Sequence, residues 1–228
     1  MKLTDKLETL ELSLWFLIGL ATALGAAVFF VWLSGEVLEG DTGRFDETIR
    51  ALVNSHASPG ITTIIQTITT LGSVSFLLCS GAAIGVLLML KRSRRSLFVF
   101  STTMLGATII NVLLKVTFKR TRPASFFGTP IPSSFSFPSG HALLALCFYG
   151  ILAYLIALRW NNLPVRCTAW SAAVLLALAI GLSRIYLGVH YPSDVIASYA
   201  AGIFWILAVI IGDRLLLRDK SNELKDIE

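Results

Sequence analysis

Long apolar runs separated by short polar segments dominate the pattern along the chain. A helix needs about 17 to 25 mostly apolar residues to cross the hydrocarbon core of a bilayer. Runs of that kind lie at about 12–34, 72–90, 97–115, 142–158, 168–186 and 195–213. The pattern therefore predicts six membrane-spanning helices. The first run is longer than the roughly 7 to 15 apolar residues of a signal peptide, so we expect it to be retained.

Shorter segments with an apolar stripe lie beside these runs. The stripe recurs at helical spacing near the N-terminus and in RFDETIRALVNS at 44–55, at Leu3, Leu7, Leu10, Phe45, Ile49, Leu52 and Val53. Such stripes predict short helices on the membrane surface. The segment ITTIIQTITTL at 61–71 is either another interfacial helix or an extension of the second span. We expect an all-α fold: one integral membrane domain over 1–228, built as a six-transmembrane-helix bundle with short interfacial helices.

Composition supports a membrane protein. Hydrophobic residues make up 55% of the 228 residues and charged residues 14%, with a mean hydropathy of +0.74, whereas soluble domains average about 25% charged residues. The net charge of +5 does not indicate nucleic acid, because the basic residues lie in short clusters between apolar runs. Anionic membrane lipids are the better partners for these clusters.

The distribution of Lys and Arg predicts the orientation. Twelve of them lie in the N-terminus, the 91–95 and 159–167 loops and the C-terminal tail, and seven lie on the opposite side. Cytoplasmic loops carry the excess. We therefore expect both termini in the cytoplasm, here of a bacterial cell with the protein in its plasma membrane, and the segments 115–141 and 184–194 outside. Two spans separate these segments, so they share a face in either orientation.

Nearly all the unusual chemistry lies in those exterior segments, in KVTFKRTRP at 115–123, FPSGHA at 137–142 and SRIYLGVHYPSD at 183–194. The candidate site residues among them are three of the cations, a hydroxyl beside a glycine, two imidazoles and the one carboxylate: Lys115, Arg122, Arg184, Ser139, Gly140, His141, His190 and Asp194. Several cations and donors around a single acid form a site for a compact polyanion, most simply a phosphoryl group.

Prolines mark where two of the spans begin. Pro138 precedes Ser-Gly-His and a long apolar run, and the N-terminus of a helix attracts anions. Pro192 is expected to be the first residue of the last span, which puts His190 just before the helix and Asp194 in its first turn. A carboxylate that holds one imidazole nitrogen leaves the other free as a nucleophile, while a second His protonates the leaving oxygen. No third ligand stands near the two His residues, so neither metal nor cofactor is expected.

Each of these residues taken alone has a simpler explanation, as a headgroup-facing cation, a helix cap or an acid at a helix N-terminus. Seven polar groups gathered on one membrane face weaken that explanation. It remains our expectation for Lys119, Arg120, His56 and the 91–95 cluster, which we predict to be solvated or to face headgroups.

The three segments resemble the signatures of the type 2 phosphatidic acid phosphatase superfamily, K-x6-R-P, P-S-G-H and S-R-x5-H-x3-D. All three are complete here, from Lys115 to Pro123, from Pro138 to His141 and from Ser183 to Asp194. The resemblance implies a six-helix membrane bundle with an extracytoplasmic active site. It also implies metal-independent dephosphorylation of a lipid phosphate, of the phosphatidylglycerol phosphate, phosphatidic acid or undecaprenyl pyrophosphate class. The vanadate-dependent haloperoxidases are similar in motif, but they are soluble.

By this resemblance His190, His141 and Asp194 are catalytic through a phosphohistidine, and the phosphate is bound by Lys115, Arg122, Ser139, Gly140 and Arg184. A rival hypothesis is a non-catalytic protein that binds or transports lipid phosphates. A binder has no need of a nucleophilic His paired with a second His, which favours hydrolysis. Substrate choice is expected to depend on the first exterior loop, the 124–136 segment and the lipid-facing helix surfaces.

Overall fold

The computed structural model describes residues 3–225, and the side chains of residues 14–217. Within that range the chain is helical, without β-strands, as predicted. The helices are α1 (Leu3–Glu39), α2 (Gly43–Ser55), α3 (Pro59–Thr70), α4 (Val74–Leu90), α5 (Arg94–Phe118), α6 (Gly140–Arg159), α7 (Leu163–Tyr186) and α8 (Pro192–Lys225).

Five of these helices are long and apolar enough to cross a membrane: α1 over Leu14–Glu39, α5, α6, α7, and α8 over Pro192–Leu217. A sixth span can come from α3 and α4 together, which bend by 42° at a short break. Most of the segment 61–71 lies in α3, which is bent against α4 and passes the length and hydropathy requirement for a span only together with it. Gly72 lies in this break, where an added Cβ would stand 2.4 Å from Cγ2 of Ile180 on α7.

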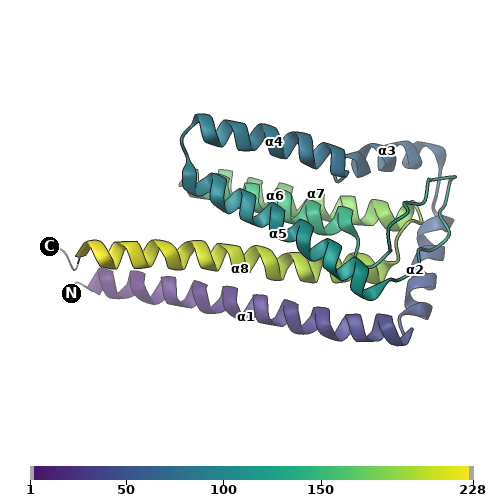
Figure 1. The fold of residues 1–228 in the computed structure, drawn as a ribbon, viewed down its shortest axis with the longest axis horizontal. Coiled ribbons are helices and arrows are strands. Elements are labelled where there is room, and N and C mark those ends of the chain that lie inside the picture. Colours follow the sequence, from purple (N-terminus) through teal and green to yellow (C-terminus); the bar gives the residue numbers. More distant parts are fainter. Residues whose placement is uncertain (1–2, 226–228) are drawn as a thin grey trace.

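The predicted interfacial helix over 44–55 is confirmed as α2, which crosses one end of the bundle (Figure 1). Its buried residues are nevertheless charged, Asp46 and Arg50, while Phe45 and Leu52 of the apolar stripe are exposed. The predicted segment with Leu3, Leu7 and Leu10 is not a separate helix, because it forms the beginning of α1. The contacts of those three side chains lie outside the described residues.

The interior of the bundle is centred on α6, which packs against α5, α7 and α8, while α1 and α8 run side by side (Figure 1). Leu143, Phe148 and Ile151 of α6 form its core with residues of α5 and α8. Helices α5 and α8 approach closely where Trp205 lies over Gly106, since a Cβ there would stand 2.0 Å from the indole ring. Large apolar side chains cover the outer faces, as expected for helices that contact lipid.

The bundle brings the three polar segments to one end. The last turns of α5 and α7 and the first turns of α6 and α8 meet there, next to α2, while the first turns of α1 and the last of α8 lie at the opposite end (Figure 1). Hydrogen bonds join the segment 115–123 to 183–194, and the backbone N–H of Ser139 in 137–142 donates to the carbonyl of Asp194. The prediction that they share one face is confirmed.

Candidate active site

Two of the predicted phosphate-binding cations come from the ends of spans. Lys115 lies in the last turn of α5, and its ammonium donates to the carbonyl of Phe135. Arg184 lies in the last turn of α7, is 6% exposed, and donates from Nη1 to Oγ1 of Thr69 on α3 at 2.7 Å. Its Nε is buried and has no hydrogen-bond partner. A buried, unpaired guanidinium N–H is costly without a ligand, so Arg184 retains donor capacity for an anion.

Arg122, the third cation, stands four residues beyond the end of α5 and is fully engaged. Its Nε and Nη2 donate to Ser134 and to the carbonyl of Phe135, and Nη1 donates to the carbonyl of Val189 at 2.8 Å. Nη1 also lies 3.0 Å from Nε2 of His190. Arg122 therefore touches the predicted nucleophile, and an incoming phosphate has to replace some of these partners.

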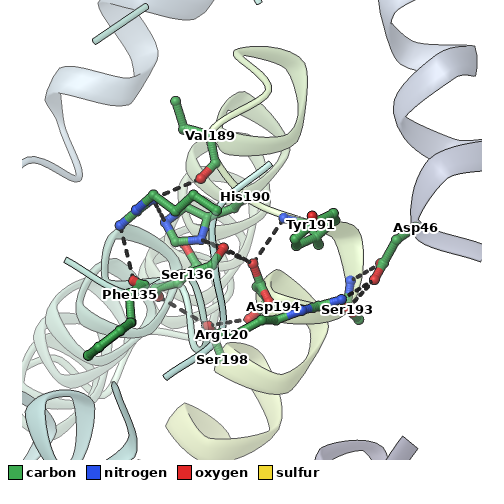
Figure 2. Close-up of polar contacts among 12 residues, drawn as sticks. Asp46, Arg120, Phe135, Ser136, Val189, His190, Tyr191, Ser193, Asp194 and Ser198 are labelled. Carbon is green, nitrogen blue, oxygen red and sulfur yellow. Dashed lines mark hydrogen bonds and ion pairs between the residues drawn. The ribbon is translucent and has the colours of Figure 1, made fainter. Parts of the chain in front are cut away.

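His190 and Asp194 meet at the start of α8. Pro192 begins α8, so the carboxylate stands in its first turn, and Nδ1 of His190 lies 3.3 Å from Oδ2 of Asp194 (Figure 2). The same oxygen accepts from the hydroxyl of Ser136 and from the backbone N–H of Tyr191 at 3.0 Å. With Nδ1–H held by the carboxylate, Nε2 carries the free lone pair and faces Arg122.

The surroundings keep His190 neutral. The ring is 1% exposed, and burial lowers the pKa of His190 to about 4, although the hydrogen bond to Asp194 and its charge oppose this shift. The nearby charges of Arg122 and Lys115 lower the pKa further. At neutral pH the imidazole is therefore the unprotonated form that a nucleophile requires.

The predicted anion site at the start of α6 has unpaired groups of its own. Ser139 is the N-cap residue, yet its hydroxyl makes no capping bond, is fully buried and lacks a partner. Gly140 is the first helical residue, and a Cβ there would stand 3.3 Å from the amide of Asn111 on α5. His141 follows, and the charged groups that act on its ring include Arg184 and Arg122. All eight predicted residues therefore lie around one site.

The expectation for Arg120 is wrong. Its side chain is 16% exposed and pairs with two buried carboxylates, Asp194 and Asp46 of α2. Asp46 also accepts from Ser193, the residue before Asp194. Sequence reasoning missed Asp46, because a single acid in an amphipathic helix has the same pattern whether it faces water or a buried partner.

The expected exposure to solvent or headgroups holds for some of the other polar residues and not for Arg95. Lys119 and His56 are exposed, as expected. In the 91–95 cluster, Arg95 instead forms a bidentate ion pair with Asp213 of α8, at 2.6 and 2.8 Å, and the hydroxyl of Tyr154 donates to the same carboxylate. This pairing ties α5, α6 and α8 together at the end away from the site.

Among the described residues, no three His, Cys, Asp or Glu side chains gather as metal ligands. The chemistry of the site comes from cations, two imidazoles, a hydroxyl and a helix N-terminus. Such a set can hold a phosphoryl group and attack its phosphorus.

Comparison with known proteins assigns the family. The family model described as PAP2 superfamily matches residues 96–215, more than half of the chain. Phosphatidylglycerophosphatase B of Bacillus subtilis is 32% identical over 190 residues, which cover 80% of this chain and 90% of the relative. An undecaprenyl-diphosphatase of Sulfolobus acidocaldarius is 29% identical over 126 residues, 53% of this chain and 56% of the relative.

The fold agrees with this assignment. The crystal structure of a transmembrane PAP2 type phosphatidylglycerolphosphate phosphatase from Bacillus subtilis superposes with a TM-score of 0.76 at 28% identity, covering 85% of this chain and 96% of that one. The sequence match covers most of the relative, and the structural match covers most of the solved protein. The similarity therefore extends over nearly the whole fold. The chain therefore belongs to the PAP2 superfamily, as an integral membrane protein.

Proposed function

We propose that this lipid phosphatase hydrolyses the phosphate of a membrane lipid through a phosphohistidine at His190, without a metal ion. The proposal is based mainly on the contacts of the two ring nitrogens of His190. Nδ1 lies 3.3 Å from Asp194, and Nε2 lies 3.0 Å from Arg122, a cation that can hold the phosphate. One nitrogen is thus fixed and the other faces the substrate.

In the first step, Nε2 of His190 attacks phosphorus in line, and the bond from phosphorus to the lipid oxygen breaks. Protonated His141 gives its proton to that departing oxygen. The phosphorylated imidazole is cationic, and the Asp194 carboxylate stabilises it through Nδ1–H. A bound phosphate dianion beside His141 favours the protonated form that this step requires.

In the second step, water attacks the phosphohistidine. His141, now neutral, accepts a proton from that water, the bond from phosphorus to Nε2 breaks, and inorganic phosphate leaves. His190 returns to its neutral form and His141 to its protonated one. Each step therefore begins with the protonation state that the previous step left.

The cations act on the charge that spreads over the equatorial oxygens of five-coordinate phosphorus. A phosphate oxygen that displaces Nε2 of His190 from the Arg122 guanidinium frees the lone pair for attack at the moment the substrate binds. Arg184 and the Ser139 hydroxyl have unpaired buried groups, and the first N–H groups of α6 lie next to them.

The favoured substrate is a phosphate monoester such as phosphatidylglycerol phosphate, because the relative with that named activity aligns over most of this chain. Undecaprenyl diphosphate is the alternative, after a relative that aligns over about half of it. The excess of Lys and Arg at the opposite end favours an extracytoplasmic site and cytoplasmic termini.

Phosphate release from purified protein tests the proposal. The panel consists of phosphatidylglycerol phosphate, phosphatidic acid and undecaprenyl diphosphate, each in EDTA, with wild type and His190→Ala side by side. We expect release by wild type alone, and an acid-labile phosphoenzyme that the variant does not form. Binding without release by the wild-type protein would instead support a lipid-phosphate binder.

A further inference from the structure

Arg120 is not a residue of the three signatures, yet its side chain makes hydrogen bonds to four residues near the site. Its Nη1 lies 2.6 Å from Oδ1 of Asp194 and its Nη2 lies 2.7 Å from Oδ2 of Asp46 (Figure 2). The guanidinium carbon lies 4.1 Å from the ring centre of Tyr191, the residue after His190. One cation therefore spans two carboxylates that are both fully buried.

Asp46 completes the link from α2 to the beginning of α8. Oδ1 accepts the backbone N–H of Ser193 at 2.9 Å, and Oδ2 accepts its hydroxyl at 2.7 Å. The first N–H groups of a helix have no partner within that helix. A carboxylate from α2 thus caps the turn of α8 that carries Asp194, and Arg120 joins the two acids.

We propose that Arg120, held by Asp46, is a positioning residue that fixes the Asp194 carboxylate against His190. The two oxygens of Asp194 have separate partners: Oδ1 meets Arg120, while Oδ2 meets Ser136 and Nδ1 of His190. Holding Oδ1 sets the rotation of the carboxylate, and that rotation aims Oδ2 at the ring. The inference rests on the proposed nucleophilic role of His190.

Arg120 is not part of the phosphate cradle. All its hydrogen bonds go to Asp46, Asp194, Ser193 and Thr42. The cation beside Nε2, on the other side of the imidazole, is instead Arg122, one of the proposed phosphate-binding residues. Loss of Arg120 should therefore slow the chemical step and leave phosphate binding nearly unchanged, which separates positioning from anion binding.

The test compares Arg120→Gln with Lys119→Gln, and Asp46→Asn with Asp41→Asn. Each control removes a charge from a nearby residue, which is exposed. Turnover, KM, the inhibition constant for inorganic phosphate and the rate of phosphoenzyme formation in a single turnover are measured for each. We expect Arg120→Gln to lower kcat and phosphoenzyme formation by about 10- to 100-fold, the range found when residues that orient metal-binding His side chains are lost.

KM and phosphate inhibition should stay within about twofold, and both controls should match wild type. Asp46→Asn should have a smaller effect in the same direction, and adding it to Arg120→Gln should cost little more, because the two residues act through one link. Arg120→Lys should recover only part of the loss, since an ammonium cannot span both carboxylates.

Two results would overturn the inference. One is normal turnover in Arg120→Gln. The other is a fall in kcat that comes with equally weakened phosphate inhibition and a lowered melting temperature, which would give Arg120 a merely structural role. Retained activity in His190→Ala would instead refute the proposed function, so the two failures are distinguishable.

Discussion

Replacing Arg184 by Lys separates a grip on the transition state from mere attraction of anionic lipid. The guanidinium is buried, and one of its nitrogens is committed to Thr69. Nε is unpaired, which leaves it and the remaining N–H groups for phosphate oxygens. Lys keeps the charge but presents a single ammonium, so the planar fork of donors is lost.

The expected magnitude follows from the loss of one charged hydrogen bond. Such a bond contributes about 1.5–3 kcal/mol, and about 1.4 kcal/mol corresponds to a tenfold change in rate. We therefore expect kcat/KM to fall by about 10- to 150-fold in Arg184→Lys. The affinity for vanadate, which adopts the five-coordinate geometry, should fall in parallel, and substrate affinity should change less.

The assay is phosphate release in detergent micelles with EDTA, together with vanadate inhibition. Arg159→Lys is the matched control, because Arg159 is exposed at the opposite end of α6, and it should behave as wild type. Near-normal turnover with undiminished vanadate inhibition in Arg184→Lys would show that Arg184 is a headgroup anchor. The assignment of this residue to the phosphate cradle would then be wrong.

Three further predictions concern the imidazoles and the packing. His141→Ala should slow lipid phosphates by about 10²- to 10⁴-fold and aryl phosphates less, because good leaving groups need less protonation; equal slowing in steady-state assays would contradict its role as the acid. Burial lowers the pKa of His190 to about 4, so protonation of His190 should lower kcat/KM of wild type only as the pH falls through about 4. A fall in kcat/KM caused by His190 protonation near pH 6.5 would contradict the lowered pKa. Gly181→Ala should destabilise the fold by about 1–3 kcal/mol, because its Cβ would stand 1.8 Å from the Tyr199 hydroxyl; thermal unfolding should show no such loss for Gly212→Ala, which meets nothing within 4 Å.

Hydropathy located the spans well and their ends less well. The run at 97–115 became α5 over Arg94–Phe118, and the run at 195–213 became part of α8 from Pro192. Helices continue past the apolar core into polar residues, which a hydropathy pattern does not count. The start of α8 was nevertheless predictable, because proline at the first helical position is a local signal.

The amino-acid pattern alone indicated the membrane class, the shared face of the three polar segments, and the positions of His190 before the last span and Asp194 in its first turn. These depend on span length, on the parity of crossings and on a proline at the first helical position, which are all local or countable properties. The contact between the His190 ring and the Asp194 carboxylate came from the structure. The position of Arg120 between Asp46 and Asp194, each 74 residues away along the chain, follows from the packing of the helices. The ion-pair partner of a charged residue cannot be identified from the sequence when the partner lies on a distant helix. Burial and ion pairing depend on which residues are neighbours in the folded protein.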